Sequence, residues 1–189
     1  MTQDSRARID AIFAETVEAH RATLQHSAGA IHEAADLIRH ALNDAGKILI
    51  FGNGGSAADA QHVAAEFINR FQVERKAFAA IALTTDTSVM TSVANDSSYE
   101  RVFSRQIEAL GRSGDIALGI STSGRSPSVL AGFRQARLQG LRTIALVGRD
   151  QSQLQSSVDL TICVPAGSTA RVQEVHRTIL HVLCELVEA

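Results

Sequence analysis

The sequence predicts an α/β protein with a flavodoxin-like, five-stranded parallel sheet that carries helices on both faces. Short, continuous apolar runs, which are typical of strands buried on both faces, alternate with segments of helical period. The helical segments contain ten or more residues in most cases, enough to serve as crossovers between parallel strands. With 189 residues, 45% of them hydrophobic, the chain is expected to form one domain, residues 1–189, with a full core.

The N-terminal segment is predicted to form two amphipathic helices. Apolar residues recur at intervals of three and four from Ile9 onwards, and the stretch QHSAGA, which contains Gly29, is expected to interrupt the pattern. We assign these two helices to residues 1–45 and the α/β core to residues 46–189.

The core is predicted to contain five strands and five further helices. The expected strands are residues 47–53, 78–83, 115–121, 142–148 and 159–165. The expected helices are residues 56–71, 86–94, 98–110, 127–139 and 170–188. In a doubly wound sheet of this kind, ligands bind beyond the carboxyl ends of the strands.

Composition argues against several classes of protein. The net charge of −2 disfavours broad electrostatic binding of nucleic acid, and no apolar run is long enough to span a membrane. The first ten residues, MTQDSRARID, contain no apolar region of the kind found in a secretory signal, so we expect a cytoplasmic protein. Cys163 and Cys184 lie in apolar stretches and are expected to be buried thiols in a reducing compartment.

Two glycine- and serine-rich loops are predicted at the carboxyl ends of strands. In the first, GNGGS at 52–56, Gly54 and Gly55 allow close approach to the backbone, and Ser56 is expected to cap the next helix. The second, STSGRSPS at 121–128, offers the hydroxyls of Ser121, Thr122, Ser123 and Ser126, with Arg125 nearby. Free N–H groups at helix starts bind anions, so the pair of loops favours a phosphorylated small molecule.

A dinucleotide fingerprint is the competing interpretation of the first loop. Gly52, Gly54 and Ala57 fit its looser form, G-x-G-x-x-A. The acidic residue that this fingerprint requires about 20 residues later is missing, because the nearest one after the second strand is Asp86. The fit is therefore poor.

Polar residues on two helices are candidates for acid–base or metal chemistry. His62 and Glu66 are four residues apart and share a helix face, although such a pair is more often an ordinary surface pair. The last helix carries Gln173, His176 and His181, of which His176 is expected at the surface and His181, flanked by apolar residues, is harder to place in water.

Several of these motifs together resemble the phosphoheptose isomerase family of the sugar isomerase (SIS) domain superfamily. The resemblance covers nearly the whole chain and includes GNGGSAADAQH, AND at 94–96, FSRQIEALGRSGD, GISTSG and QEVH. It implies aldose–ketose isomerisation of sedoheptulose 7-phosphate to D-glycero-manno-heptose 7-phosphate through an enediolate. This reaction is the first step of nucleotide-activated heptose biosynthesis, which supplies lipopolysaccharide core or capsule.

The resemblance also implies roles for individual residues. The residues matching the phosphate site are Ser121, Thr122, Ser123 and Ser126. Those expected to line the sugar are Asn53, Gly54, Gly55, Ser56, His62, Glu66, Asn95, Asp96 and Gln173. Glu66 and His181 match the acid–base pair, and His62, Glu66, Gln173 and His181 match a zinc-binding set. Ala170 replaces a carboxylate that some family members use to contact a sugar hydroxyl.

The family implies a homotetramer with active sites at subunit interfaces, in which the N-terminal helices take part. Gln173 and His181 are eight residues apart, about 12 Å along a straight helix, so both reach one ion only if Gln173 extends, the helix is irregular, or another subunit contributes. The alternative function is a non-catalytic SIS regulator that binds the replication initiator protein. The retained set of Glu66, Gln173, His181 and His62 favours the enzyme.

Overall fold

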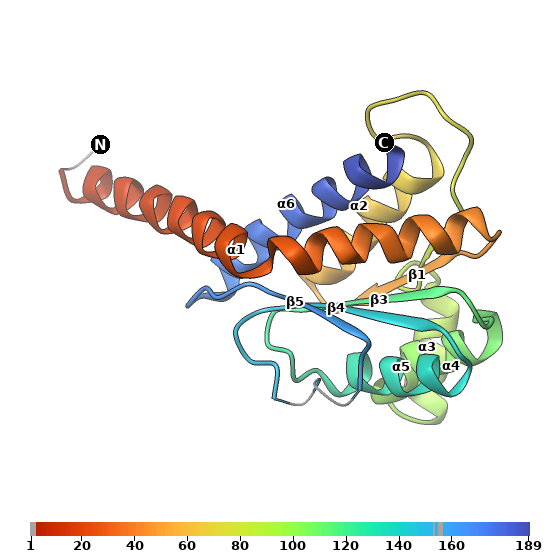
Figure 1. Cartoon of the computed structure of the whole chain (residues 1–189). Coiled ribbons are helices and arrows are strands. Elements are labelled where there is room, and N and C mark those ends of the chain that lie inside the picture. Colours follow the sequence, from red (N-terminus) through yellow and green to blue (C-terminus); the bar gives the residue numbers. More distant parts are fainter. Residues whose placement is uncertain (1–2, 153, 155–156) are drawn as a thin grey trace.

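The fold is built around a five-stranded, all-parallel sheet (Figure 1). The computed structural model describes residues 3–152, 154 and 157–189. The strands are β1 (Ile48–Gly52), β2 (Ala80–Ala82), β3 (Ile116–Ser121), β4 (Arg142–Val147) and β5 (Leu160–Cys163). Their order, β2-β1-β3-β4-β5, is the flavodoxin-like order, which confirms the predicted fold class.

Helices cover both faces of the sheet because successive strand residues point to opposite sides (Figure 1). Ile48 and Ile50 pack towards α1 (Gln3–Asn43), α2 (Gly55–Ile68) and α6 (Thr169–Glu188). Leu49 and Phe51 pack into the second core, beneath α4 (Val102–Leu110) and α5 (Pro127–Leu138). The short elements α3 (Thr87–Asp96) and η1 (Tyr99–Arg101) lie on that second side.

The prediction of two N-terminal helices is wrong, because α1 is one continuous helix from Gln3 to Asn43. Gly29 lies within it, next to Ala28 and Ala30, and a single glycine costs a helix only about 1 kcal/mol relative to alanine. Packing on both sides of the glycine outweighs this cost: Ser27 is buried and donates a hydrogen bond to the Cys163 carbonyl (2.7 Å), and Ile31 is buried. The N-terminal half of α1 projects beyond the sheet (Figure 1).

The end of α2 also differs from the prediction, which extended this helix to residue 71. The helix ends at Ile68, where the guanidinium of Arg75 takes over its last carbonyl groups. Arg75 donates to the carbonyl oxygens of Glu66 and Phe67, both at 2.9 Å. Unpaired carbonyls at a helix end need such partners, and this partner lies outside the periodic segment that the prediction used.

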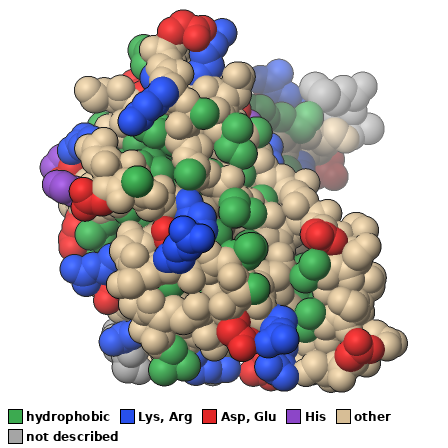
Figure 2. Space-filling model, turned by 90° about the vertical axis from the view of Figure 1, so that its right-hand side faces the viewer, with side chains coloured by type: hydrophobic (Ala, Val, Ile, Leu, Met, Phe, Trp, Pro, Cys, Tyr) green, Lys and Arg blue, Asp and Glu red, His purple; other side chains and the backbone are tan. Residues whose placement is uncertain are grey.

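The surface gives two further observations. On the face shown in Figure 2, side chains of both charges are dispersed among neutral ones, so that face carries no continuous basic surface. Among the described residues, none of the helices combines the length and apolar character needed to cross a bilayer. Both cysteines are buried free thiols, as expected.

Candidate active site

The two predicted loops meet at the point where the direction of strand addition reverses. β1 and β3 are neighbours, with Gly52 opposite Ile120 at their carboxyl ends. The chain leaves β1 into α2 on one face of the sheet and leaves β3 into α5 on the other. The two connections therefore diverge at the usual ligand position of a doubly wound sheet.

Asn53 joins the two loops through its side-chain amide. Its Nδ2 donates to the hydroxyls of Ser126 (2.8 Å) and Ser128 (2.9 Å), and its Oδ1 accepts from the hydroxyl of Tyr99 (2.8 Å). Ser128 and Tyr99 were not among the predicted site residues, because neither stands out in a single sequence. The amide of Asn53 thus positions the second loop as well as bordering the site.

The hydroxyls of the second loop lie at different depths. Ser121 is buried, Thr122 and Ser126 are half-buried, and Ser123 is exposed and accepts from the backbone N–H of Arg125 (3.2 Å). Gly124 has a φ of +66°, and a Cβ there would lie 2.1 Å from the carbonyl oxygen of Asp150, so only glycine fits this turn. The loop backbone is therefore fixed by this turn, and its hydroxyls range from buried to exposed.

Helix capping differs at the two loops. Ser126 occupies the N-cap of α5 and is followed by a proline, as predicted, but its hydroxyl makes no capping hydrogen bond. Ser56 was expected to cap α2; this is wrong, because α2 begins at Gly55 with Gly54 as its N-cap, and Ser56 lies buried within the first turn. Gly54 has a φ of +57°, a conformation that glycine adopts more readily than serine. The helix therefore begins one residue before Ser56.

Three of the predicted chemical residues come together between α2 and α6. Nε2 of His62 and Nε2 of His181 are 2.7 Å apart, and Nδ1 of His62 lies 3.7 Å from Oε1 of Glu66. The histidine contact requires that one ring carries a proton on Nε2 and that the other does not. The carboxylate, half-buried, faces the far nitrogen of His62. The arrangement links a carboxylate and two imidazoles in a row, which suits proton transfer.

The same residues carry donor atoms of the kinds that bind zinc. Imidazole and carboxylate are suitable donors for zinc, and two nitrogens bound to one tetrahedral ion lie about 3.3 Å apart. The 2.7 Å between the two Nε2 atoms is shorter, so the rings would have to separate slightly. Among the described residues, no three His, Cys, Asp or Glu side chains form a metal-binding group. The donor types fit zinc, and the ligand set stays a prediction.

Gln173 lies next to the first loop, two turns of α6 before His181. A Cβ on Gly55 would lie 2.0 Å from Nε2 of Gln173, so the glutamine amide rests against the place where that side chain would be. Gln173 and His181 both line a cavity of about 570 Å³ on the outer side of α6, together with His20, Ala170, Glu174, Arg177 and Thr178. α6 is regular throughout, and within the described chain Gln173 makes no hydrogen bond with either histidine.

Asn95 and Asp96 lie apart from this group. They are exposed at the end of α3, where Nδ2 of Asn95 donates to Oδ1 of Asp96 (2.8 Å). In the described part of the chain, neither makes a hydrogen bond to the two loops. Their expected contact with sugar hydroxyls stays a prediction.

His176 was expected at the surface; this is wrong, because it is fully buried beneath α6. Neither of its ring nitrogens makes a hydrogen bond among the described residues. Burial lowers the pKa of His176 to about 4, opposed by the nearby Val147 carbonyl and the Asp59 carboxylate, so the ring is neutral at pH 7. His176 follows Val172 by four residues and therefore shares the apolar face of α6. The prediction overlooked this spacing.

The last turn of α6 positions His181 through a neighbouring segment. The Glu188 carboxylate accepts hydrogen bonds from the backbone N–H groups of Phe71 (2.6 Å), Gln72 (2.8 Å) and Val73 (3.2 Å) and from Nε of Arg75 (2.9 Å). Although burial raises the pKa of Glu188, these hydrogen bonds outweigh it and lower the pKa below its usual value.

Phe71 is the residue through which this network reaches the site. Its ring stacks on the His181 imidazole, with 5.3 Å between centroids. The segment 71–75 follows the helix without regular structure, so hydrogen bonds to Glu188 hold it in place. Sequence reasoning missed this role because the two partners are 117 residues apart.

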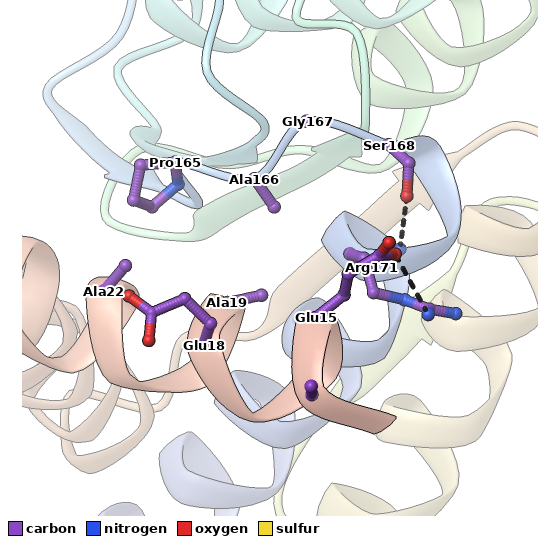
Figure 3. A pocket seen from close by; sticks show the side chains of 10 residues that line it. Glu15, Glu18, Ala19, Ala22, Pro165, Ala166, Gly167, Ser168 and Arg171 are labelled. Atoms are coloured by element: carbon purple, nitrogen blue, oxygen red, sulfur yellow. Dashed lines mark hydrogen bonds and ion pairs between the residues drawn. The ribbon is translucent and has the colours of Figure 1, made fainter. Parts of the chain in front are cut away.

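A larger cavity, of about 670 Å³, lies elsewhere (Figure 3). It opens between α1 and the segment that leads from β5 into α6, and its charged lining residues are Glu15, Glu18 and Arg171. None of the predicted site residues lines it. Size alone therefore does not mark the site, whereas the convergence of the loops and the imidazoles does.

Comparison with known proteins agrees with the fold. Residues 12–148 match the SIS domain family, so the chain is a SIS domain protein. The phosphoheptose isomerase of Roseiflexus sp. (strain RS-1) is 52% identical over 95% of this chain and 91% of the relative. The chain thus belongs to the phosphoheptose isomerase family.

Solved structures of phosphoheptose isomerases have the same fold. The phosphoheptose isomerase of Neisseria gonorrhoeae superposes with a TM-score of 0.92 at 41% identity, covering 97% of this chain and 98% of the other. That of Francisella tularensis gives a TM-score of 0.93 at 35% identity, covering 99% and 98%.

Proposed function

We propose that the protein is an aldose–ketose isomerase that converts sedoheptulose 7-phosphate to D-glycero-manno-heptose 7-phosphate. The reaction is the first step of nucleotide-activated heptose biosynthesis. The observation that carries this function is the row formed by Glu66, His62 and His181, beside the loops that follow β1 and β3. Membership of the phosphoheptose isomerase family supplies the substrate.

Glu66 serves as the base in this proposal. It removes a proton from C1 of the ketose, next to the C2 carbonyl, and an enediolate forms with negative charge on the C2 oxygen. Return of this proton to C2, with transfer of the proton on the C1 oxygen to the C2 oxygen, gives the aldose. His181 is the partner that moves protons at the oxygens, and each group contributes on the order of 10²–10⁴-fold if well placed.

The loops at the carboxyl ends of β1 and β3 hold the phosphate and the sugar. The hydroxyls of Ser121, Thr122, Ser123 and Ser126 and the N–H groups at the start of α5 supply donors for the phosphate. Binding there, remote from the reacting carbons, positions the substrate for proton transfer.

Zinc is the proposed cofactor, held by His62, Glu66, Gln173 and His181. When bound, it would polarise the carbonyl and stabilise negative oxygen, an effect of several kcal/mol. Gln173 lines the same cavity as His181, which supports its inclusion. Ligands of this type are not selective for zinc over related divalent ions.

One series of activity measurements, with and without removal of the metal, tests both the isomerase function and the zinc cofactor. The purified protein is incubated with sedoheptulose 7-phosphate, and aldose formation is followed before and after dialysis against a chelator. We expect conversion before dialysis, loss of at least 10-fold afterwards, and recovery on addition of zinc. Conversion that persists without any bound metal would exclude zinc, and absence of conversion in every sample would exclude the isomerase.

The regulator alternative predicts a different outcome. A SIS protein that binds the replication initiator would be retained on an immobilised initiator protein and would leave the sugar phosphate unchanged. The family members described above are named as isomerases and give this alternative no support. We further propose that the protein acts in the cytoplasm and that its product feeds lipopolysaccharide or capsule synthesis.

We also propose a homotetramer whose active sites lie at subunit interfaces. The N-terminal half of α1 projects from the body (Figure 1) and exposes apolar side chains along one side: Ile9, Phe13, Val17 and Leu24. A row of this kind, on a projecting helix, favours contact with another subunit.

Phe13→Asp is expected to dissociate the tetramer, because Phe13 is 70% exposed in the single chain and an interface would bury it. Light scattering coupled to gel filtration measures the mass. If active sites are shared between subunits, the variant also loses isomerase activity although its site residues are unchanged. Leu138→Asp is the matched control, since Leu138 is exposed on α5. A Phe13→Asp protein that stays tetrameric would contradict the proposed interface.

A further inference from the structure

α2 and α6 are joined by a seam of three contacts, one helical turn apart, which we call the polar seam. At one end Gln173 lies against Gly55, and at the other His181 contacts His62. Between them, Arg177 pairs with Asp59. The end contacts consist of residues already placed in the proposed site, whereas the middle contact has no assigned role.

We propose that Arg177 is a substrate-binding residue, whose guanidinium donates hydrogen bonds to oxygens of the sugar chain between its phosphate and its reacting carbons. The inference rests on the proposed function. In this proposal Arg177 helps to determine how the open-chain sugar lies in the site. Asp59 holds the guanidinium of Arg177 in position.

Asp59 fixes the guanidinium from below. Its side chain is completely buried, and its Oδ1 accepts from Nη2 (2.7 Å) and Nε (3.2 Å) of Arg177. A buried carboxylate is costly without a partner, so the pairing holds the arginine in one place. Arg177 itself is 55% exposed, which leaves the outer edge of its guanidinium at the surface of the cavity.

The geometry of the pair leaves donors free. Paired arginines and carboxylates commonly form two parallel hydrogen bonds, one to each oxygen. Here both bonds go to Oδ1, and within the described chain neither Oδ2 of Asp59 nor Nη1 of Arg177 makes a hydrogen bond. Because a guanidinium has five N–H donors, three remain for a ligand.

The position along α6 agrees with a contact to the sugar chain. Gln173, Arg177 and His181 follow one another at intervals of four residues and line the same cavity of about 570 Å³. The phosphate is expected at the loops beyond Gly55, and proton transfer at the row of Glu66, His62 and His181. A substrate that spans these ends passes Arg177. Ala170, also in the cavity lining, has no polar side-chain atom to offer.

The test distinguishes two roles of Arg177: binding the substrate, and only neutralising the charge of Asp59. Arg177→Met removes the donors, and the double variant Asp59→Asn/Arg177→Met removes both charges. For each, KM and kcat with sedoheptulose 7-phosphate and the midpoint of thermal unfolding are measured. Arg142→Met is the matched control, because Arg142 is exposed at the amino end of β4, far from the loops.

We expect Arg177→Met to raise KM roughly 10- to 100-fold, the effect of losing hydrogen bonds to a charged donor. The double variant should unfold at a higher temperature than Arg177→Met and keep the raised KM. Recovery of KM in the double variant, or a KM unchanged by Arg177→Met, would overturn the inference. If Arg177→Met does not fold, the double variant alone decides: a raised KM supports the contact, and a wild-type KM refutes it.

Inhibition by inorganic phosphate identifies which part of the substrate is bound. Because the proposed contact is to the sugar chain, the inhibition constant of phosphate should be unchanged in Arg177→Met. A parallel rise in that constant would overturn the inference. Conversion by the wild-type protein is measured first: its absence counts against the proposed function, whereas conversion with an unaltered KM in the variant counts against Arg177 alone.

Discussion

Glu66→Gln is expected to lower kcat for sedoheptulose 7-phosphate by about 10²–10⁴-fold, because the amide cannot accept the proton that the carboxylate removes from carbon. The substitution keeps the size of the side chain and its place beside Nδ1 of His62. The midpoint of thermal unfolding should therefore change little. Initial rates of aldose formation at saturating substrate measure the effect.

Glu108→Gln provides the matched control for this variant. Glu108 lies on α4, on the other side of the sheet, in an exposed ion pair with Arg105. Its rate should equal that of the wild type within error. If the Glu66→Gln protein keeps more than a tenth of the wild-type kcat, Glu66 is not the base.

Phe51→Ala is expected to have the largest effect on stability, about 3–5 kcal/mol in the free energy of unfolding. Phe51 is fully buried at the end of β1, with ring centroids 5.4 Å from those of both Phe103 and Phe133. Removing its ring leaves a cavity between β1, α4 and α5 directly beneath the first loop. Urea denaturation at one fixed protein concentration measures the change, since an oligomer's stability depends on concentration.

Leu138→Ala is the control for this second variant. Leu138 is 82% exposed at the end of α5, so its truncation should alter the free energy of unfolding by no more than about 0.5 kcal/mol. A loss below about 1.5 kcal/mol for Phe51→Ala would mean that the core rearranges to fill the space.

The strands and crossovers were predictable because their signal is local. Apolar runs such as KILIF and DIALGI identify strands without reference to the rest of the chain, and the helical segments between them require a parallel sheet. The same holds for the two loops, whose glycines and serines follow β1 and β3 directly. The observed strand order confirms this part of the prediction.

Errors arose where contacts outside the periodic pattern decided the structure. Gly29 was expected to end a helix, but packing around Ser27 and Ile31 carries α1 through it. α2 was predicted to be longer, but Arg75 ends it. His176 was expected at the surface, but it is buried between α6 and the sheet. At Gly29, tertiary packing outweighed a helix propensity of about 1 kcal/mol.

The sequence by itself determined the class of fold, the position of the two glycine- and serine-rich loops and the identity of the candidate acid–base residues, because residue type and spacing carry that information. Only the tertiary structure decided that His62 contacts His181, that Asn53 joins the loops, and that Arg177 stands over Asp59 between them. These pairs are 73 to 119 residues apart in the chain. No local pattern specifies such contacts, because they depend on how α2 packs beside α6 and on how β1 and β3 bring their loops together.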